Sequence, residues 1–76
     1  MRAIDARRLR AVMVLNGDTV RSLAAKLGLH PSTLSRTLNG RREFRVHEVV
    51  SIVRLYRLTP GEVDAIFFPA WRRASA

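Results

Sequence analysis

Apolar residues recur along this chain at intervals of three and four positions, the spacing that places side chains on one face of an α-helix. Val49-Val50 and Ile52-Val53 have strand propensity, but they belong to a helical stripe that continues to Tyr56. The pattern therefore predicts an all-α fold without a strand. Five short helices are expected, over about residues 4–16, 20–27, 31–38, 46–57 and 60–68.

Residues with strong preferences for helix ends stand between the apolar stretches. Asn16-Gly17 and Asn39-Gly40 tolerate the left-handed conformation of a helix C-cap. Asp18-Thr19 offers N-cap side chains, and Pro31 falls in a first helical turn, where its missing N–H costs least. The segment Thr59-Pro60-Gly61-Glu62 has the order of a capping box. These signals set the expected helix boundaries.

The apolar stripes also predict which side chains point inward. Each predicted helix contributes two to four of them at helical spacing. The expected inward residues are Leu9, Val12, Met13, Leu23, Ala24, Leu27, Leu34, Leu38, Val49, Ile52, Val53, Tyr56, Val63, Ile66 and Phe67.

The length of 76 residues and the absence of cysteine limit what the chain can be. One small domain is expected, without disulfides or thiolate metal sites. His30 and His47 lie far apart and lack cysteine partners, so we expect neither a metal site nor a cofactor. The apolar stretches are too short to span a membrane, and Arg7, Arg8 and Arg10 interrupt any signal-peptide core. We expect a cytoplasmic protein.

The net charge of +8 is the most informative number in the composition, and all but one of the 14 basic residues are arginine. Such an excess points to a polyanionic partner, usually nucleic acid. Arginine suits phosphates and guanine edges because its planar fork donates two parallel hydrogen bonds. A highly charged soluble surface, or GC-rich coding, would also produce arginine in this number.

Residues 19–40 have the layout of a helix-turn-helix, in which two short helices are joined by a tight turn containing glycine. Ala24 is small enough for the two helices to approach closely, and Leu29 in the turn fills the gap between them. The alternative is a helical hairpin that serves stability alone. The basic charge and the small polar face of the second helix favour DNA reading.

This segment resembles the Cro/C1-type (XRE) helix-turn-helix family of phage and bacterial repressors, and the likeness extends over about residues 9–68. The resemblance implies a compact five-helix, lambda-repressor-like DNA-binding domain over residues 1–69, with the motif at 19–38 and a tail at 70–76. The matching elements are Thr19, Leu23-Ala24, Leu27-Gly28-Leu29, Ser32-Thr33-Leu34-Ser35-Arg36, Leu38-Asn39-Gly40-Arg41 and Leu58-Thr59-Pro60-Gly61-Glu62-Val63.

In that family the second helix of the motif lies in the major groove, which here is 31–38. Arg36 is the best candidate for base reading, through a bidentate contact to guanine. Pro31 departs from the family, where many members have a polar side chain that reads a base. Ser32 and Thr33 can equally serve as first-turn caps, and His30 as a cap or a phosphate contact. The candidate base-reading residues are His30, Pro31, Ser32, Thr33, Ser35 and Arg36.

Phosphate contacts are expected on both sides of this helix. The start of the preceding helix offers free N–H groups, and a basic loop with one aromatic follows residue 38. Any one of these arginines can instead be a solvated surface charge. The candidates are Thr19, Val20, Arg21, Asn39, Arg41, Arg42 and Arg45.

Four large apolar residues close together near the C-terminus predict a second copy of the chain as a partner. Ile66 and Phe67 are expected to close the core, which leaves Phe68 and Trp71 for a dimer interface. A two-fold dimer would place its two reading helices about 34 Å apart, one turn of DNA. The alternative is that Trp71 folds back on its own domain.

The sequence thus predicts a transcriptional regulator, not an enzyme, that binds a double-stranded operator as a homodimer on the nucleoid. It resembles a phage or prophage repressor or Cro-like protein, with no evident small-molecule effector. An excisionase or antitoxin would share these features, and so would an adaptor that binds another protein. A nucleophile elbow, a phosphate-binding glycine loop and a carboxylate pair are all missing from the sequence.

Overall fold

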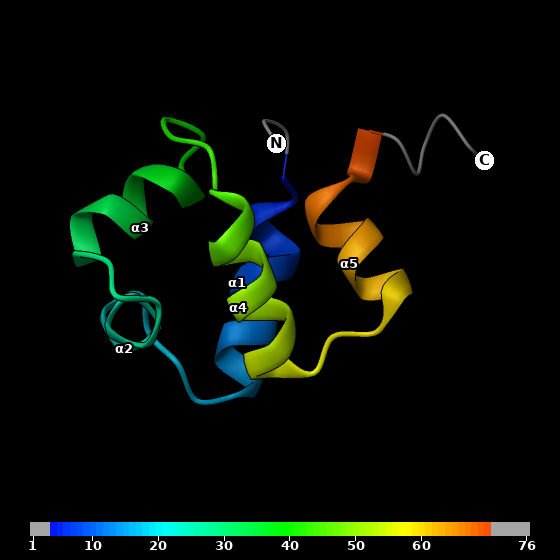
Figure 1. Cartoon of the computed structure of the whole chain (residues 1–76), viewed down its shortest axis with the longest axis horizontal. Helices are drawn as coiled ribbons and strands as arrows, with labels where there is room; N and C mark the ends of the chain where they lie inside the picture. The colour runs from blue at the N-terminus through cyan, green and yellow to red at the C-terminus, as the bar shows by residue number, and fades with distance from the viewer. Residues whose placement is uncertain (1–3, 71–76) are drawn as a thin grey trace.

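The computed structural model describes residues 4–70, which form five helices and no strand (Figure 1). The all-α prediction is confirmed. The helices are α1 (Ala6–Leu15), α2 (Val20–Leu27), α3 (Pro31–Leu38), α4 (Val46–Tyr56) and α5 (Pro60–Phe67).

The predicted bounds of α2 and α3 are those observed, whereas α1, α4 and α5 are shorter than expected. Helix α1 begins at Ala6 because the Asp5 carboxylate accepts the Arg8 N–H at 3.1 Å and caps the helix. Helix α4 ends at Tyr56 because Arg57 adopts a left-handed conformation, with φ of 51°. Arg57 is the one non-glycine residue with positive φ among residues 4–70.

The helices form two ends joined by a middle layer. Figure 1 shows α2 and α3 at one end, α5 at the other, and α1 and α4 between them. Helix α2 packs against α3 and α4, and α1 packs against α5. The Asp5 N–H donates to the Ile66 carbonyl at 2.7 Å, which ties the start of α1 to α5.

All but one of the buried core residues belong to the apolar stripes that the sequence predicted. The buried apolar residues are Leu9, Met13, Leu23, Ala24, Leu34, Leu38, Phe44, Val49, Ile52, Ile66 and Phe67. The other predicted inward residues, Val12, Leu27, Val53, Tyr56 and Val63, are partly buried against this core.

Phe44 was not expected in the core, because it stands among arginines in the loop between α3 and α4. It is only 5% exposed, and its ring meets the Phe67 ring edge-on at a centroid distance of 6.0 Å. Aromatic pairs favour this arrangement because the positive edge of one ring faces the negative face of the other. The loop is therefore attached to α5 by an apolar contact.

None of the helices in the described part of the chain is long and apolar enough to cross a membrane.

Candidate nucleic-acid interface

Helix α2 begins with a reciprocal cap that leaves part of its N-terminus open. Thr19 Oγ1 accepts the Ser22 N–H at 3.1 Å, and Ser22 Oγ accepts the Thr19 N–H at 2.9 Å. The N–H groups of Val20 and Arg21 make no hydrogen bond within residues 4–70. Free N–H groups at a helix start carry partial positive charge and can donate to an anion.

The turn between α2 and α3 depends on Gly28, which ends α2 in the left-handed conformation at φ of 70°. The Leu29 N–H then returns to the Ala24 carbonyl at 2.8 Å, which satisfies one of the last carbonyls of α2. Ala24 is fully buried and Leu29 is partly buried against the core. This turn sets the angle at which α3 leaves α2.

One side of α3 is buried against the core, and the other side is exposed. Leu34, Thr37 and Leu38 are buried, whereas His30, Ser32 and Arg36 are exposed. Pro31, Thr33 and Ser35 are partly exposed. The Arg36 guanidinium makes no hydrogen bond or ion pair with any other residue in 4–70, so its donors are free for an external partner.

His30 is the N-cap of α3, as one of its two sequence-based interpretations predicts. Its Nδ1 accepts the Ser32 N–H at 3.1 Å and lies 2.7 Å from Ser32 Oγ. Pro31 follows at the first helical position, where no N–H is needed.

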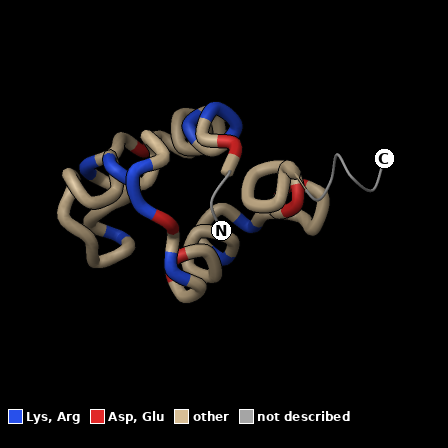
Figure 2. Tube along the Cα trace, turned by 90° about the horizontal axis from the view of Figure 1, so that it is seen from above, with Lys and Arg blue, Asp and Glu red and all other residues tan. Residues whose placement is uncertain are grey.

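The loop from Asn39 to Arg45 is basic, and its arginines differ in their partners. Figure 2 shows basic positions on this loop separated by an acidic one, with other basic positions on α1 and on the α2–α3 end. Arg41 and Arg45 are exposed. Arg42 is turned inward, with only 18% of its side chain exposed.

Arg42 forms a two-pronged ion pair with the buried Glu48 of α4. Its Nη1 and Nη2 donate to Glu48 Oε1 and Oε2 at 3.1 and 2.9 Å, and Nη1 also donates to Thr37 Oγ1 at 3.0 Å. Glu48 Oε1 also accepts the Arg45 N–H at 2.9 Å, which caps α4. Burial raises the pKa of Glu48, but the Arg42 and Arg45 hydrogen bonds outweigh it and leave that pKa lowered. The pKa of Arg42 is raised by the same pair.

A second buried carboxylate, Asp18, joins the start of α2 to the end of α4. Its Oδ1 accepts from Ser22 Oγ at 2.6 Å and from Lys26 Nζ at 2.8 Å, and its Oδ2 accepts from Tyr56 at 2.7 Å. The Lys26, Ser22 and Tyr56 hydrogen bonds lower the pKa of Asp18 to about 2. Burial, followed by the bond to Asp18, raises the pKa of Tyr56. Thr19, not Asp18, is the residue that caps α2.

A family model described as a helix-turn-helix domain, of the Cro/C1/XRE type, matches residues 6–66. The chain belongs to this helix-turn-helix family. Neither the comparison with curated proteins nor the comparison with solved structures gave a match. The helix-turn-helix of this chain consists of α2, the turn at Gly28 and α3, and such a domain binds double-stranded DNA.

The helix-turn-helix brings most of the sequence-predicted residues together around α3. The start of α2, the exposed residues of α3 and the loop up to Arg45 all fall within residues 19–45, and α2 and α3 lie at one end of the molecule (Figure 1). Thr37 and Glu48 were not assigned to this region from the sequence. Glu48 could have been found, because it lies three residues after Arg45, the spacing of a capping box. Nothing in the sequence marks Arg42 as the partner of Glu48.

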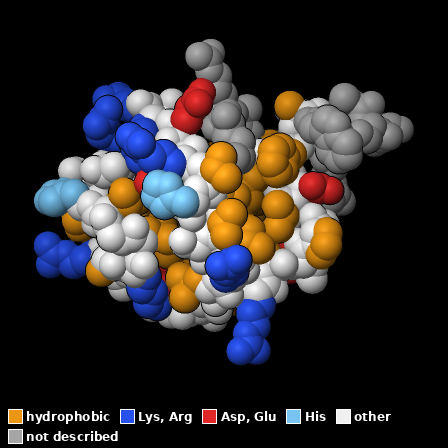
Figure 3. Space-filling model, in the orientation of Figure 1, with side chains coloured by type: hydrophobic (Ala, Val, Ile, Leu, Met, Phe, Trp, Pro, Cys, Tyr) orange, Lys and Arg blue, Asp and Glu red, His pale blue; other side chains and the backbone are white. Residues whose placement is uncertain are grey.

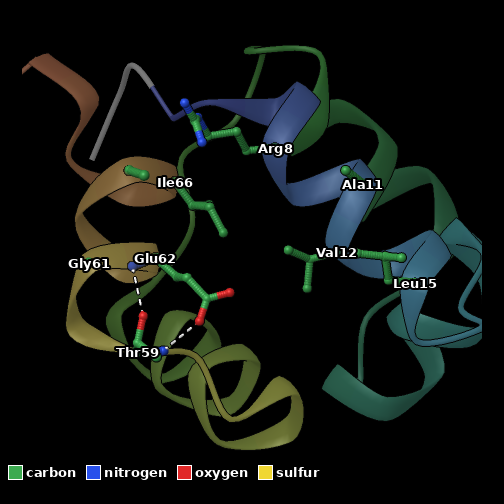
Figure 4. A pocket seen from close by; sticks show the side chains of 9 residues that line it. Arg8, Ala11, Val12, Leu15, Thr59, Gly61, Glu62 and Ile66 are labelled. Carbon is green, nitrogen blue, oxygen red and sulfur yellow. Dashed lines mark hydrogen bonds between the residues drawn. The ribbon is translucent and has the colours of Figure 1, made fainter.

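Of the two residues predicted for a dimer interface, Phe68 lies at the other end, where it follows α5 and is 40% exposed. Trp71 lies outside the described residues. A hollow of about 420 Å³ lies between α1 and α5, where Val12 and Leu15 face Ile66 across it (Figure 4). The Thr59–Glu62 capping box predicted from the sequence forms one rim of this hollow.

Proposed function

We propose that this chain is a sequence-specific transcriptional regulator that inserts α3 into the major groove of an operator. It resembles the repressors and Cro-like proteins of phages and prophages, and it would act in the cytoplasm, on the nucleoid, by occupying DNA. One observation carries the proposal. Ser32 and Arg36 stand exposed one helical turn apart on α3, and the Arg36 guanidinium is uncommitted within residues 4–70.

Base reading is assigned to the exposed side of α3. Arg36 would contact a guanine, with Ser32 one turn nearer the helix start. His30, Pro31, Thr33 and Ser35 flank this pair and would make the remaining contacts to the groove.

Phosphate contacts are assigned to both sides of α3. The open N–H groups of Val20 and Arg21, next to Thr19, would hold one strand. Asn39, Arg41 and Arg45 in the following loop would hold the other. Arg42 is assigned a different task, because its guanidinium is bound to Glu48 and Thr37 and holds the loop in place.

A homodimer is proposed for the bound state. Figure 3 shows hydrophobic side chains gathered over α4 and α5 on the face viewed. Val46 and Val50 of α4, and Phe68 after α5, are exposed large apolar residues. Sedimentation with and without operator DNA would test this. Phe68→Ser is expected to shift the protein toward the monomer, and an unchanged distribution would remove Phe68 from the interface.

Selection of binding sites from random duplexes tests the proposed function. A palindromic consensus is expected, with affinity that falls steeply with salt because counterions are released. Arg36→Ala should lower affinity for the consensus by roughly 5- to 100-fold, the range of a lost bidentate base contact, and leave non-specific DNA nearly unaffected.

Arg10→Ala is the matched control, because Arg10 is exposed on α1 and its removal changes the net charge equally. Equal weakening by Arg36→Ala on every duplex would make Arg36 a phosphate contact. Absence of any enriched sequence would refute sequence-specific binding.

A further inference from the structure

His30 and Ser32 form a hydrogen-bonded pair at the start of α3. The Ser32 N–H donates to His30 Nδ1 at 3.1 Å, and the Ser32 hydroxyl oxygen lies 2.7 Å from the same nitrogen. Both side chains are exposed on the end of α3 that base edges would meet.

The direction of these bonds follows from the chemistry of the two groups. A backbone N–H can only donate, so Nδ1 accepts and carries no proton; the neutral ring then holds its proton on Nε2. With no hydrogen on Nδ1, the hydrogen between Nδ1 and Ser32 Oγ belongs to the hydroxyl. Ser32 therefore donates to His30, and its oxygen keeps only its capacity to accept.

The Nδ1 lone pair of His30 is used by the two groups of Ser32. Ser32 is the second residue of α3, and an N-cap side chain ordinarily accepts from the N–H of the second or third helical residue. The hydroxyl is thus oriented before any DNA arrives, which lowers the entropy that a base contact costs.

We propose that His30 determines specificity by making Ser32 an acceptor-only reader of DNA. This rests on the proposed function, in which α3 lies in the major groove. A free serine hydroxyl can pair with any base there, because it donates or accepts. An acceptor-only hydroxyl requires an exocyclic amine, which the major groove offers on adenine (N6) and cytosine (N4) and not on guanine or thymine.

Binding-site selection with three variants tests this proposal, at pH 8, where imidazole is ordinarily neutral. The wild type should select adenine or cytosine at one position, and Ser32→Ala should lose that preference. His30→Gly frees the hydroxyl and should lower the ratio of adenine or cytosine to guanine or thymine there by about fivefold, the worth of one hydrogen bond. His30→Asn is the matched control: its neutral acceptor oxygen should retain the preference.

Three results of the binding-site selection would overturn the proposal. They are a guanine or thymine at the position that Ser32→Ala relaxes, no position that responds to Ser32→Ala, and a His30→Gly preference equal to that of the wild type. Glycine is tolerated at the N-cap, so the variant is expected to fold, which thermal unfolding checks.

Nitrogen-15 NMR of the free protein separates this inference from the proposed function. The His30 ring should carry its proton on Nε2, and a proton on Nδ1 would overturn the inference whatever the DNA results. If the wild type enriches no sequence, the proposed function fails and the base preference fails with it, even where the tautomer is as expected.

Discussion

Asp18 and Glu48 are both buried carboxylates, and they join opposite ends of α4 to the helix-turn-helix. Asp18 connects the start of α2 to Tyr56 at the end of α4, whereas Glu48, at the start of α4, binds Arg42 in the loop after α3. Their partners differ. Asp18 is satisfied by two hydroxyls and by Lys26, whose side chain is 47% exposed, and Glu48 by a guanidinium that is 18% exposed.

This difference in partners predicts how much unfolding free energy is lost when each carboxylate is removed. If Asp18 is removed, water can solvate the Lys26 ammonium, because 47% of the Lys26 side chain is already exposed. An arginine that loses Glu48 is left as an unpaired charge in a mostly buried site, which is the expensive case. The Glu48 pair should therefore contribute more to stability, although each carboxylate accepts three hydrogen bonds.

The largest expected effect is from Glu48→Leu, which should lower the free energy of unfolding by about 3 kcal/mol because Arg42 stays buried without its partner. Urea unfolding followed by circular dichroism measures this.

The double variant Arg42→Met/Glu48→Leu is the control, since it removes both charges together. It should be more stable than the Glu48→Leu single variant. A single variant that loses less than about 1 kcal/mol, the typical worth of a surface ion pair, would place the Arg42–Glu48 pair in the class of exposed pairs.

Asp18→Asn should cost roughly 2 kcal/mol at pH 7, since it weakens hydrogen bonds to a charged group. The loss should also depend on pH. The folded pKa of about 2 lies below the ordinary 3.8, so the stabilisation by Asp18 is present above pH 4 and is lost as pH falls toward 2.

The difference in unfolding free energy between wild type and Asp18→Asn, measured from pH 7 to pH 2, checks the sign. It should stay constant down to about pH 4 and then shrink, given the ordinary and folded pKa values of 3.8 and about 2. A difference that grows toward pH 2 would contradict a lowered pKa.

Tyr56→Phe should cost about 1 kcal/mol, since it removes one hydrogen bond to Asp18 and keeps the ring against the core. Thermal unfolding measures the loss. The variant should also raise the folded pKa of Asp18 toward its ordinary value of 3.8, so less stability should be lost between about pH 4 and pH 2 than in the wild type. An acid transition identical to that of the wild type would show that Tyr56 contributes packing alone.

Lys26→Gln has the smallest expected effect, about 0.5 kcal/mol, because a half-exposed ion pair is well screened by water. Repeating the unfolding in high salt should reduce the difference from the wild type. A loss as large as that of Glu48→Leu would remove the contrast between the two carboxylates.

Local features of the fold and of the candidate site were predictable from the sequence, and pairings between residues far apart in the chain were not. The bounds of α2 and α3, the Gly28 turn and the capping box at Thr59 depend on residues within about five positions, which periodicity and cap preferences report. The sequence also left His30 as either a cap or a phosphate contact. Its bond to the Ser32 hydroxyl depends on side-chain geometry that residue identity does not specify.

The sequence by itself determined five helices, their inward faces and the membership of α3 in a helix-turn-helix, because these follow from neighbours along the chain. Only the tertiary structure decided which polar groups of the site are already bound. Asp18 and Tyr56 are 38 positions apart, and Phe44 meets Phe67 across the fold. In the sequence Arg42 cannot be told apart from the other loop arginines, and only the folded structure pairs it with Glu48. Whether a charged side chain is paired depends on which groups folding brings next to it, and neither composition nor sequence spacing specifies those neighbours.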